Sequence, residues 1–467
     1  MTRWTKGWRL GLAIFVLATL THLPSLVRSQ ALNPDEAFLA TEGSVLNAGG
    51  RLYVDVVDRK PPIAPYLYAT AQRVSGSTSL FPLRWLALSA HIVTALLLAA
   101  LARRRWGDTA AVVAAGLYLL ASAGMAVDDA QAANFEAFML PCTVAAVLLA
   151  ERGRPVAAGA AAAAAGLVKQ VGLAVLAPVV VLCWRRGRGP GVAASVLSCG
   201  AVIVAVALVF GWRDFFFWNV TGNGRFVDPT GSWDQIRSEV SAGTRTFLLG
   251  SGAAVVLAVV GLRHWRDDAD LWLWLAASAA GVAAGFHFFG HYYLQLLPPL
   301  ALLAASSASR LRPAVLPAAA VAAVITAALF VVPAFTARIP SPGYETLAVE
   351  VEARTAPSDP IFVWGHLPQL YWAADRPPAT RFLTVGFLTG SGRGRAPERV
   401  GVQYATPGAW EELFADLAAH PPALVADISE RTFFAIDRFP AFASWLHANY
   451  HRTAVVQGVS LYERGAP

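Results

Sequence analysis

The chain has 467 residues, of which 56% are hydrophobic and 14% are charged, and its mean hydropathy is +0.50. Soluble domains carry about 25% charged residues, so this composition excludes an ordinary soluble protein and indicates an integral membrane protein. The net charge of +7 does not indicate nucleic-acid binding, because the arginines lie in short clusters between apolar runs, as they do in cytoplasmic loops. The three cysteines all lie in apolar runs, which argues against a disulfide framework and a cysteine-ligated metal site.

The N-terminal part has a basic start, residues 1–9, and an apolar run, residues 10–27. A cleaved signal peptide has the same pattern, but many apolar runs follow, so a retained first span with a cytoplasmic N-terminus is favoured. Residues 33–62 then form a polar, proline-punctuated loop that we expect outside the membrane. Residues 63–74 are too short to cross a core of ~30 Å at ~1.5 Å per residue, so they predict an interfacial helix.

The later apolar runs predict about eleven crossings in all, with every arginine cluster on the cytoplasmic side and the C-terminus outside. The run at 156–184 is interrupted by Lys169-Gln170, and we expect two short spans with this dipeptide at their outer turn. An aromatic outer loop is expected at 212–245. The other runs lie at 80–101, 109–127, 137–150, 192–210, 246–262, 271–289, just before Arg310, and at 313–332.

The composition changes near residue 336, where apolar runs shorten to strand length and alternate with amphipathic stretches at 410–419 and 439–450. This alternation predicts a small α/β domain. The predicted fold is therefore an α-helical polytopic membrane domain, residues 1–335, followed by an extracytoplasmic α/β domain, residues 336–467. The strand-length runs are 361–364, 424–426, 454–456 and 459–462.

Two adjacent carboxylates, Asp35 and Glu36, follow directly on the first apolar run. A solvated outer loop would also carry such a pair, but ionisable groups near the end of a span are costly and tend to be functional. A carboxylate at this place can act as general base towards an acceptor hydroxyl. Asp55 and Asp58 lie in the same loop and, taken alone, are predicted to be solvated.

Lys60 precedes Pro61-Pro62 at the end of this loop. One alternative is a lysine at the membrane interface, since proline is favoured at a helix start. The other is a fixed cation beside an anionic leaving group, such as the phosphate of a lipid-linked donor.

A second acidic segment contains Asp128, Asp129, Asn134 and Glu136. A polar loop is the alternative, but Glu136 is followed at once by an apolar span, so its side chain lies near the membrane surface.

Lys169, His291 and Tyr292 are further polar breaks expected on the same face. A lysine inside an apolar run costs about 2.5–3.5 kcal/mol at the membrane centre, so it is expected at a turn or lining a cavity. His287 and His291 have the i, i+4 spacing of metal ligands on one helix face, but no acidic residue lies nearby in the sequence. A divalent cation is left open, and no other cofactor is indicated.

Three motifs resemble the first outer loop of the GT-C glycosyltransferases, in particular the bacterial dolichyl-phosphate-mannose-protein mannosyltransferase and aminoarabinose-transferase group. They are Asn-Pro-Asp-Glu-Ala-Phe at 33–38, Gly-Gly-Arg-Leu-Tyr at 49–53 and Lys-Pro-Pro at 60–62. Later segments are similar to further motifs of that group, so the resemblance extends over nearly the whole chain. These segments are 134–136, 166–170, 291–299, 363–366 and 376–381.

The resemblance implies an inverting transferase that uses a polyprenyl-phosphate sugar at the outer face of the plasma membrane. It implies that Asp35 is the general base with Glu36 as its close support, and that Lys60 holds the lipid phosphate. Residues Glu136, Asp128, Asp129 and Asn134 would form a second acidic, substrate-lining segment, and Lys169, His291 and Tyr292 would contact the donor phosphate or sugar.

Several alternatives stay open at this point. Ala37 and Phe38 stand where the aminoarabinose-transferase group commonly has a basic residue, which leaves the sugar open. The acceptor is a protein, a lipid or a glycan. A transporter or lipid flippase with an outward-facing acidic site is the alternative function, although the internal repeats typical of transporters are not visible in the sequence. A third alternative is that the C-terminal domain alone is functional and the spans are its anchor.

Overall fold

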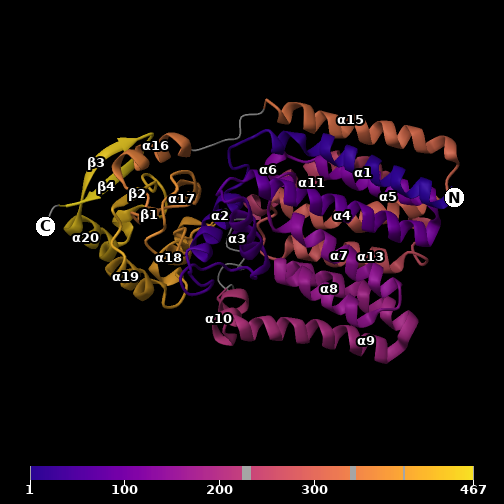
Figure 1. The fold of residues 1–467 in the computed structure, drawn as a ribbon, viewed down its shortest axis with the longest axis horizontal. Helices are drawn as coiled ribbons and strands as arrows, with labels where there is room; N and C mark the ends of the chain where they lie inside the picture. Colours follow the sequence, from indigo (N-terminus) through magenta and orange to yellow (C-terminus); the bar gives the residue numbers. More distant parts are fainter. Residues whose placement is uncertain (1, 223–232, 337–342, 393–394, 466–467) are drawn as a thin grey trace. The chain divides into compact units, whose positions relative to one another are not determined.

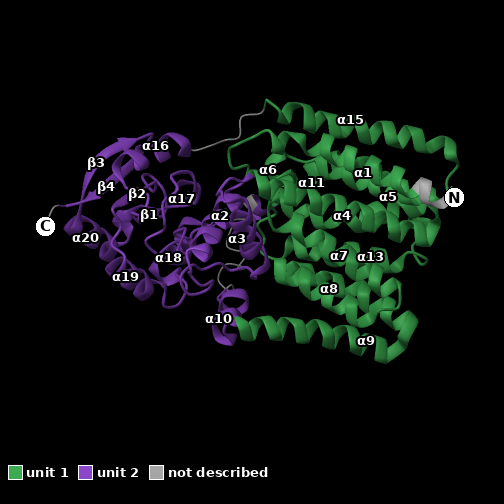
Figure 2. Cartoon of the chain, in the orientation of Figure 1, with its two compact units in different colours: residues 1–32, 81–209, 237–337 green, residues 33–80, 210–236, 338–467 purple. Residues whose placement is uncertain are grey.

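The computed structural model describes residues 2–222, 233–336, 343–392 and 395–465. The chain forms two compact units, and each is assembled from separate stretches of the sequence (Figure 2). Unit 1 comprises Met1–Leu32, Phe81–Val209 and Arg237–Ala337. Unit 2 comprises Asn33–Leu80, Phe210–Ile236 and Arg338–Pro467.

Unit 1 is a helical bundle in which α4, α5, α7 and α8 lie side by side (Figure 1). The apolar runs predicted to be spans are mostly helical, although the run at 246–262 is broken at Ser251 and the run at 271–289 is helical only to Ala283. The predicted break at Lys169-Gln170 separates α8 from α9. A kink at Arg188, with φ +52°, divides α9 at the arginine cluster. The helices are α1 Thr2–Leu26, α4 Phe81–Trp106, α5 Asp108–Ala123, α6 Val127–Ala130, α7 Phe135–Glu151, α8 Pro155–Val168, η1 Gln170–Val175, α9 Leu176–Val209, most of α11 Trp233–Gly250, α12 Gly252–Val260, η3 Gly261–His264, α13 Ala269–Ala283, η4 Gly290–Leu296, α14 Leu297–Ala308, η5 Pro313–Val315 and α15 Leu316–Ala334.

Among the described residues, four helices are long and apolar enough to cross a membrane: Gly7–Leu26, Phe81–Trp106, Gln170–Val209 and Pro313–Ala334. The pair Ile236–Gly250 and Gly252–His264, bent by 81°, adds a fifth if it is one span. The remaining apolar helices are shorter than a full crossing. The helical membrane character predicted from the sequence is therefore confirmed, whereas the number of about eleven crossings stays a prediction.

Arginines from separate connections of unit 1 meet around a few carboxylates. The Arg105 guanidinium lies 2.7 Å from the Asp270 carboxylate and 3.0 Å from that of Glu151. Arg186 also binds Glu151, at 2.9 Å, and Arg310 binds the neighbouring Asp268 at 3.0 Å. This clustering supports the prediction that the arginine-rich connections share one side of the bundle.

The polar residues predicted on the outer side include Glu136, which lies at the end of α7 opposite to Glu151 and the arginine cluster. Glu136 lies in the first turn of this helix and Glu151 is its last residue. Fifteen residues at ~1.5 Å each place the two ends about 22 Å apart along the axis. Within unit 1, the Glu136 and Glu151 groups are therefore at opposite ends of one helix, as the alternation of inner and outer loops predicts.

Unit 2 contains a four-stranded sheet in the order β1-β2-β4-β3, with β1 parallel to β2 and the other pairs antiparallel. The strands lie where the short apolar runs predict them: β1 Ile361–Trp364, β2 Leu424–Asp427, β3 Tyr450–Val456 and β4 Val459–Arg464. β1 and β2 are buried along their whole length, and the Trp364 ring stacks on that of Phe442 at 4.3 Å.

The helices of unit 2 include segments from before residue 336. The longest are α2 and α3, which come from the first predicted outer loop and the predicted interfacial helix. The helices are α2 Pro34–Asn47, α3 Ile63–Ser75, α10 Trp212–Phe216, the π-helix Phe217–Thr221, α16 Tyr344–Arg354, α17 Gln369–Ala373, α18 Gly386–Thr389, η6 Pro397–Arg399, η7 Val402–Tyr404, α19 Ala409–Ala419, η8 Ile436–Arg438 and α20 Pro440–Asn449.

The prediction of a loop over residues 33–62 is wrong, because Pro34–Asn47 forms helix α2. The Asn33 side chain caps it by accepting a hydrogen bond from the Asp35 N–H at 2.9 Å, and proline occupies the first helical position. Asp35 and Glu36 lie in the first turn, where negative charges stabilise the helix by interacting with the positive end of its dipole. The proline and the charges, taken as loop signals, are helix-start signals here.

The loop prediction for residues 212–245 is wrong in the same way. Helix α10, the π-helix and the start of α11 occupy much of this segment, and α11 begins at Trp233. Its residues 223–232 lie outside the described part of the chain.

Candidate active site

In unit 2, the start of α2 and the segment before α3 bring Asp35 and Lys60 together. The Lys60 Nζ lies 3.8 Å from Asp35 Oδ2, and both side chains are partly exposed, at 25% and 31%. A ligand can therefore reach both members of the pair. The structure thus places the predicted base and the predicted phosphate-binding cation next to each other within unit 2.

Hydrogen bonds hold the Lys60 backbone in place. The Tyr53 hydroxyl donates to the Lys60 carbonyl at 2.8 Å, and the Asn219 amide donates to the Tyr53 hydroxyl at 3.0 Å. Tyr53 and Asn219 are buried. Neither contact is visible in the sequence, because Asn219 lies 166 residues beyond Tyr53.

Glu36, predicted as the close support of Asp35, has a different environment. Its side chain is fully buried, whereas Asp35 faces outward. Only Asp35 of this pair is thus accessible to a ligand.

Two buried carboxyls flank the Asp35–Lys60 pair. Burial raises the pKa of Glu42 well above its ordinary value, and the negative charges of Asp58 and Asp35 raise it further, whereas Lys60 lowers it. Burial likewise raises the pKa of Asp58, against the effect of Lys60. Both Glu42 oxygens and Asp58 Oδ2 have no hydrogen-bond partner in the part of the chain described.

The prediction that Asp58 is solvated is therefore wrong, whereas Asp55 is exposed as predicted and pairs with Arg51. Glu42 was missed entirely. A signal for it exists: seven residues are about two helical turns, so Glu42 and Asp35 lie on the same face of α2.

Arg59 is a second residue that the sequence did not single out. Its guanidinium lies 4.2 Å from the centre of the Phe387 ring and donates to the Gly386 carbonyl and the Thr406 hydroxyl, each at 3.4 Å. Burial lowers the pKa of Arg59 to about 10, although the Asp58 charge opposes this. Arg59 therefore fixes the segment that carries Lys60 to other parts of unit 2.

In unit 1, Lys169 and Glu136 form a buried ion pair. Helix α8 ends at Val168, and the extended backbone of Lys169, with φ −153°, turns its side chain away from the helix. The Lys169 ammonium donates to Glu136 Oε1 and lies 3.7 Å from the centre of the Tyr292 ring. The expectation that this lysine lies at a turn rather than facing lipid is confirmed.

Asp129 and His291 form the second contact of this cluster. Asp129 Oδ1 accepts a hydrogen bond from the His291 backbone N–H at 3.0 Å and lies 3.3 Å from its Nδ1. A Cβ on Gly290 would lie 2.0 Å from Asp129 Oδ2, so only glycine permits this approach.

His287 and His291 do not lie on one helix face, the arrangement that their i, i+4 spacing allows. Helix α13 ends at Ala283 and η4 begins at Gly290, and the segment between them contains Phe286 and Phe288 with positive φ. The ring of Phe289 instead lies between the two imidazoles, stacked on each. Within the described ranges, no group of three or more His, Cys, Asp or Glu side chains is arranged to hold a metal ion.

Asn134 and Asp128 lie near these contacts in the sequence. Asn134 is the N-cap residue of α7 and is fully buried, and its side-chain amide has no hydrogen-bond partner among the described residues. Burial raises the pKa of Asp128, and the charge of Asp129 adds to this.

The predicted site residues thus fall into two clusters, one in each unit. Asp35, Glu36 and Lys60 belong to unit 2, and the residues Asp128, Asp129, Asn134, Glu136, Lys169, His291 and Tyr292 belong to unit 1.

Comparison with known proteins bears on the fold and the family. The model of glycosyltransferase family 87 matches residues 61–289. No curated protein matches the chain significantly. The crystal structure of ArnT from Cupriavidus metallidurans bound to undecaprenyl phosphate is similar, with a TM-score of 0.64, 16% identity, and coverage of 100% of this chain and 99% of ArnT. Its apo state gives a TM-score of 0.68.

A second similar structure is the archaeal oligosaccharyltransferase AglB from Archaeoglobus fulgidus, solved with an inhibitory peptide and a dolichol-phosphate. Its TM-score is 0.55 at 13% identity, covering 99% of this chain and 75% of AglB. At these identities the structural likeness shows the fold alone. The family 87 model covers a little under half of the chain, and the likeness to ArnT and AglB shows the fold that the whole chain shares with them.

Proposed function

We propose that the protein is an inverting glycosyltransferase that moves a sugar from a polyprenyl-phosphate donor to an acceptor hydroxyl. The observation that carries this proposal is the 3.8 Å pairing of Lys60 with Asp35 in a partly exposed position. The pair supplies the two groups that the reaction needs, a cation for the phosphate and a base for the hydroxyl. The likeness to ArnT, solved with undecaprenyl phosphate, supports a donor of this class.

The reaction follows from these two groups. Lys60 binds the donor phosphate, and this phosphate replaces Asp35 as the partner of the ammonium. The Asp35 carboxylate then takes the proton of the acceptor hydroxyl. At the same time the oxygen of that hydroxyl attacks the anomeric carbon from the face opposite the phosphate. The bond between that carbon and the phosphate oxygen breaks, so the products are a glycoside of inverted configuration and polyprenyl phosphate.

The unit 1 cluster has a separate role in this proposal. Lys169 is already neutralised by Glu136, so it is a weaker phosphate ligand than Lys60 and serves to hold Glu136 in place. In this proposal Tyr292, Asp129 and His291 stay the predicted contacts of the donor sugar.

We propose that the site lies at the outer face of the plasma membrane, with about eleven crossings, a cytoplasmic N-terminus and residues 336–467 as an outer domain. The meeting of the arginine clusters at the other end of unit 1 supports this orientation.

The experiment that tests the function uses proteoliposomes containing undecaprenyl phosphate linked to a radiolabelled sugar. A cell-envelope extract serves as the acceptor pool. The proposal predicts that label moves to the extract while free undecaprenyl phosphate appears in equal amount. A flippase would expose the labelled lipid to the outside without cleaving it, and this result would overturn the proposal.

A further inference from the structure

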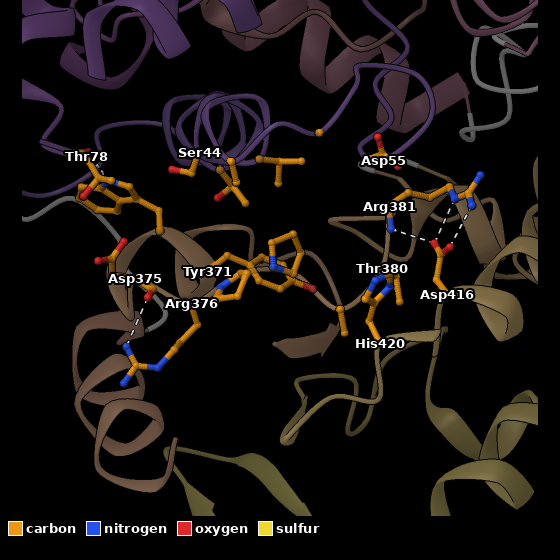
Figure 3. Close-up of a pocket in the computed structure, with 18 of the residues that line it drawn as sticks. Ser44, Asp55, Thr78, Tyr371, Asp375, Arg376, Thr380, Arg381, Asp416 and His420 are labelled. Carbon is orange, nitrogen blue, oxygen red and sulfur yellow. Dashed lines mark hydrogen bonds and ion pairs between the residues drawn. The ribbon is translucent and has the colours of Figure 1, made fainter. Parts of the chain in front are cut away.

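A cavity of about 490 Å³ lies within unit 2, apart from the Asp35–Lys60 pair (Figure 3). Its walls come from α2 and the loop after it, from residues 371–381 and from the end of α19. The volume falls in the range of small-molecule sites, roughly 300–1,000 Å³.

The cavity and the catalytic pair use different faces of α2. Ser44, which lines the cavity, is nine residues beyond Asp35, and nine residues are about two and a half helical turns. The two side chains therefore project from opposite sides of the helix. A ligand in the cavity does not occupy the position of the donor phosphate.

Polar side chains at both ends of the cavity are available to a ligand. Asp375 lies near Thr78 at one end, and His420 lies near Asp416 at the other (Figure 3). Within the described part of the chain, neither the Asp375 carboxylate nor the His420 imidazole has a hydrogen-bond partner. Asp375 also has a φ of +48°, a conformation uncommon outside glycine that often marks a functional position.

The charges of the lining disfavour an anionic ligand. Asp416 accepts two hydrogen bonds from the Arg381 side chain, at 3.0 and 2.9 Å, and Glu412 lies 3.4 Å from the same guanidinium. Arg376 donates to Thr355 and to the Ala374 carbonyl. Both cations are thus satisfied, whereas the Asp375 carboxylate is not, so a phosphate or uronate would meet repulsion.

An extended peptide is also a poor match. The edge of β1 is already paired, because the Ile361 N–H donates to the Pro377 carbonyl and Ala379 donates back to Ile361. Pro377 and Pro378, which line the cavity, have no N–H to offer a further strand. The backbone pairing by which peptides join a sheet edge is therefore not available here.

The remaining walls suit a sugar ring. The Trp372 indole N–H donates to the Thr78 carbonyl at 2.8 Å, which fixes the ring, and Pro377, Pro378 and Ala48 add apolar surface. Sugar rings have an apolar face that packs on such surfaces and hydroxyls that donate to carboxylates and imidazoles.

We infer that this cavity binds a neutral oligosaccharide. The inference rests on the proposed glycosyltransferase function, in which this oligosaccharide is part of the acceptor, remote from the reacting hydroxyl. Binding energy from a remote part of a substrate contributes to catalysis at the reacting centre, so a long acceptor gains over a short one.

The test is a titration of the full-length protein in nanodiscs with three neutral probes: mannotriose, galactotriose and maltotriose. At least one should bind, and Asp375→Asn should weaken its binding about tenfold or more, because one charge-assisted hydrogen bond is lost. Asparagine tolerates positive φ, so this variant keeps the backbone. The control Asp437→Asn, at an exposed residue outside the cavity, should leave the affinity unchanged.

Absence of binding for all three probes, or equal affinity in Asp375→Asn, would overturn the inference. So would preferential binding of a trisaccharide of glucuronic acid or of an extended peptide. Undecaprenyl phosphate binding serves as the independent readout, and Asp375→Asn should not change it. If the donor assay shows transfer but no probe binds, the cavity inference alone fails. If a probe binds but no sugar leaves the lipid donor, the proposed function alone fails.

Discussion

The Lys60 ammonium lies 3.8 Å from the carboxylate of Asp35. Asp35 is in the first turn of helix α2, whose proline and charges also fit a loop. In this position each group is held near the other but neither is sealed from ligands. A donor phosphate that binds Lys60 would release Asp35 to act as a base. The pair therefore links donor binding to activation of the acceptor.

Replacing Lys60 should weaken donor binding. Lys60→Gln removes a charge-assisted hydrogen bond to the phosphate, so the Kd for undecaprenyl phosphate should rise about tenfold or more. Lys60→Arg keeps the charge and should lose less, although a guanidinium does not reproduce the compact ammonium. Titration of the purified variants measures both values. Equal affinity of Lys60→Gln and the native protein would exclude Lys60 from the phosphate site.

Glu42 should make the protein less stable as the pH rises. Below its ordinary value of 4.5 this carboxyl is protonated in the folded and unfolded states alike. Above that value the unfolded chain loses the proton while the folded protein keeps it, because burial raises the pKa in the folded state. The free energy of unfolding should therefore fall as the pH rises from 4.5 towards the raised value.

The variant Glu42→Gln cannot titrate, so its apparent Tm should depend less on pH above 4.5 than that of the native protein. Asp437→Asn, at an exposed carboxylate, should keep the native slope. Thermal melts in detergent measure both. A steeper fall in Glu42→Gln would show that Glu42 is ionised in the folded state.

Gly290 should not tolerate a methyl group. In Gly290→Ala the new Cβ would lie 2.0 Å from Asp129 Oδ2, so Asp129 must move and lose its bond to His291. We expect a loss of about 1–3 kcal/mol in the free energy of unfolding, together with reduced transfer. Gly285→Ala is the matched control: its Cβ meets His287 Cδ2 at an ordinary 3.5 Å, so it should be near neutral. Similar melts for the two variants would contradict the close approach.

Glu136 and Lys169 should behave as one unit in a double-mutant cycle. Each of Glu136→Gln and Lys169→Met leaves an uncompensated buried charge, at a cost of about 3–5 kcal/mol. The double variant removes both charges and should cost less than the sum of the two single losses. Unfolding in detergent measures the cycle. Strict additivity would mean that the ion pair does not exist in the folded protein.

Much of the fold follows from the sequence because its signals are local. The helices of unit 1 come from long apolar runs, and the strands of unit 2 come from short ones. Helix α2 was not predicted, because its N-cap residue Asn33 and the following Pro34 also fit the start of a loop. The assembly of unit 2 from three separate stretches could not be predicted, because such contacts depend on long-range packing.

The site was predictable only in part for the same reason. Asp35 lies beside Lys60 and Glu136 beside Lys169, whereas the sequence predicted these residues only as members of one site and gave no partner for Lys169. Burial decides the rest. Asp58 is buried and Asp55 is exposed, although both lie in similar polar sequence. The raised pKa of Glu42 depends on its burial, which the sequence does not show.

The central claim is that Asp35 is the base of a sugar transfer from a polyprenyl-phosphate donor. Its most direct test compares Asp35→Asn with the exposed control Asp437→Asn in the labelled-donor assay. The account predicts that Asp35→Asn lowers transfer by about 10²–10⁴-fold, the usual contribution of a general base, while the apparent Tm and undecaprenyl phosphate binding are retained. Full transfer activity in Asp35→Asn would contradict it.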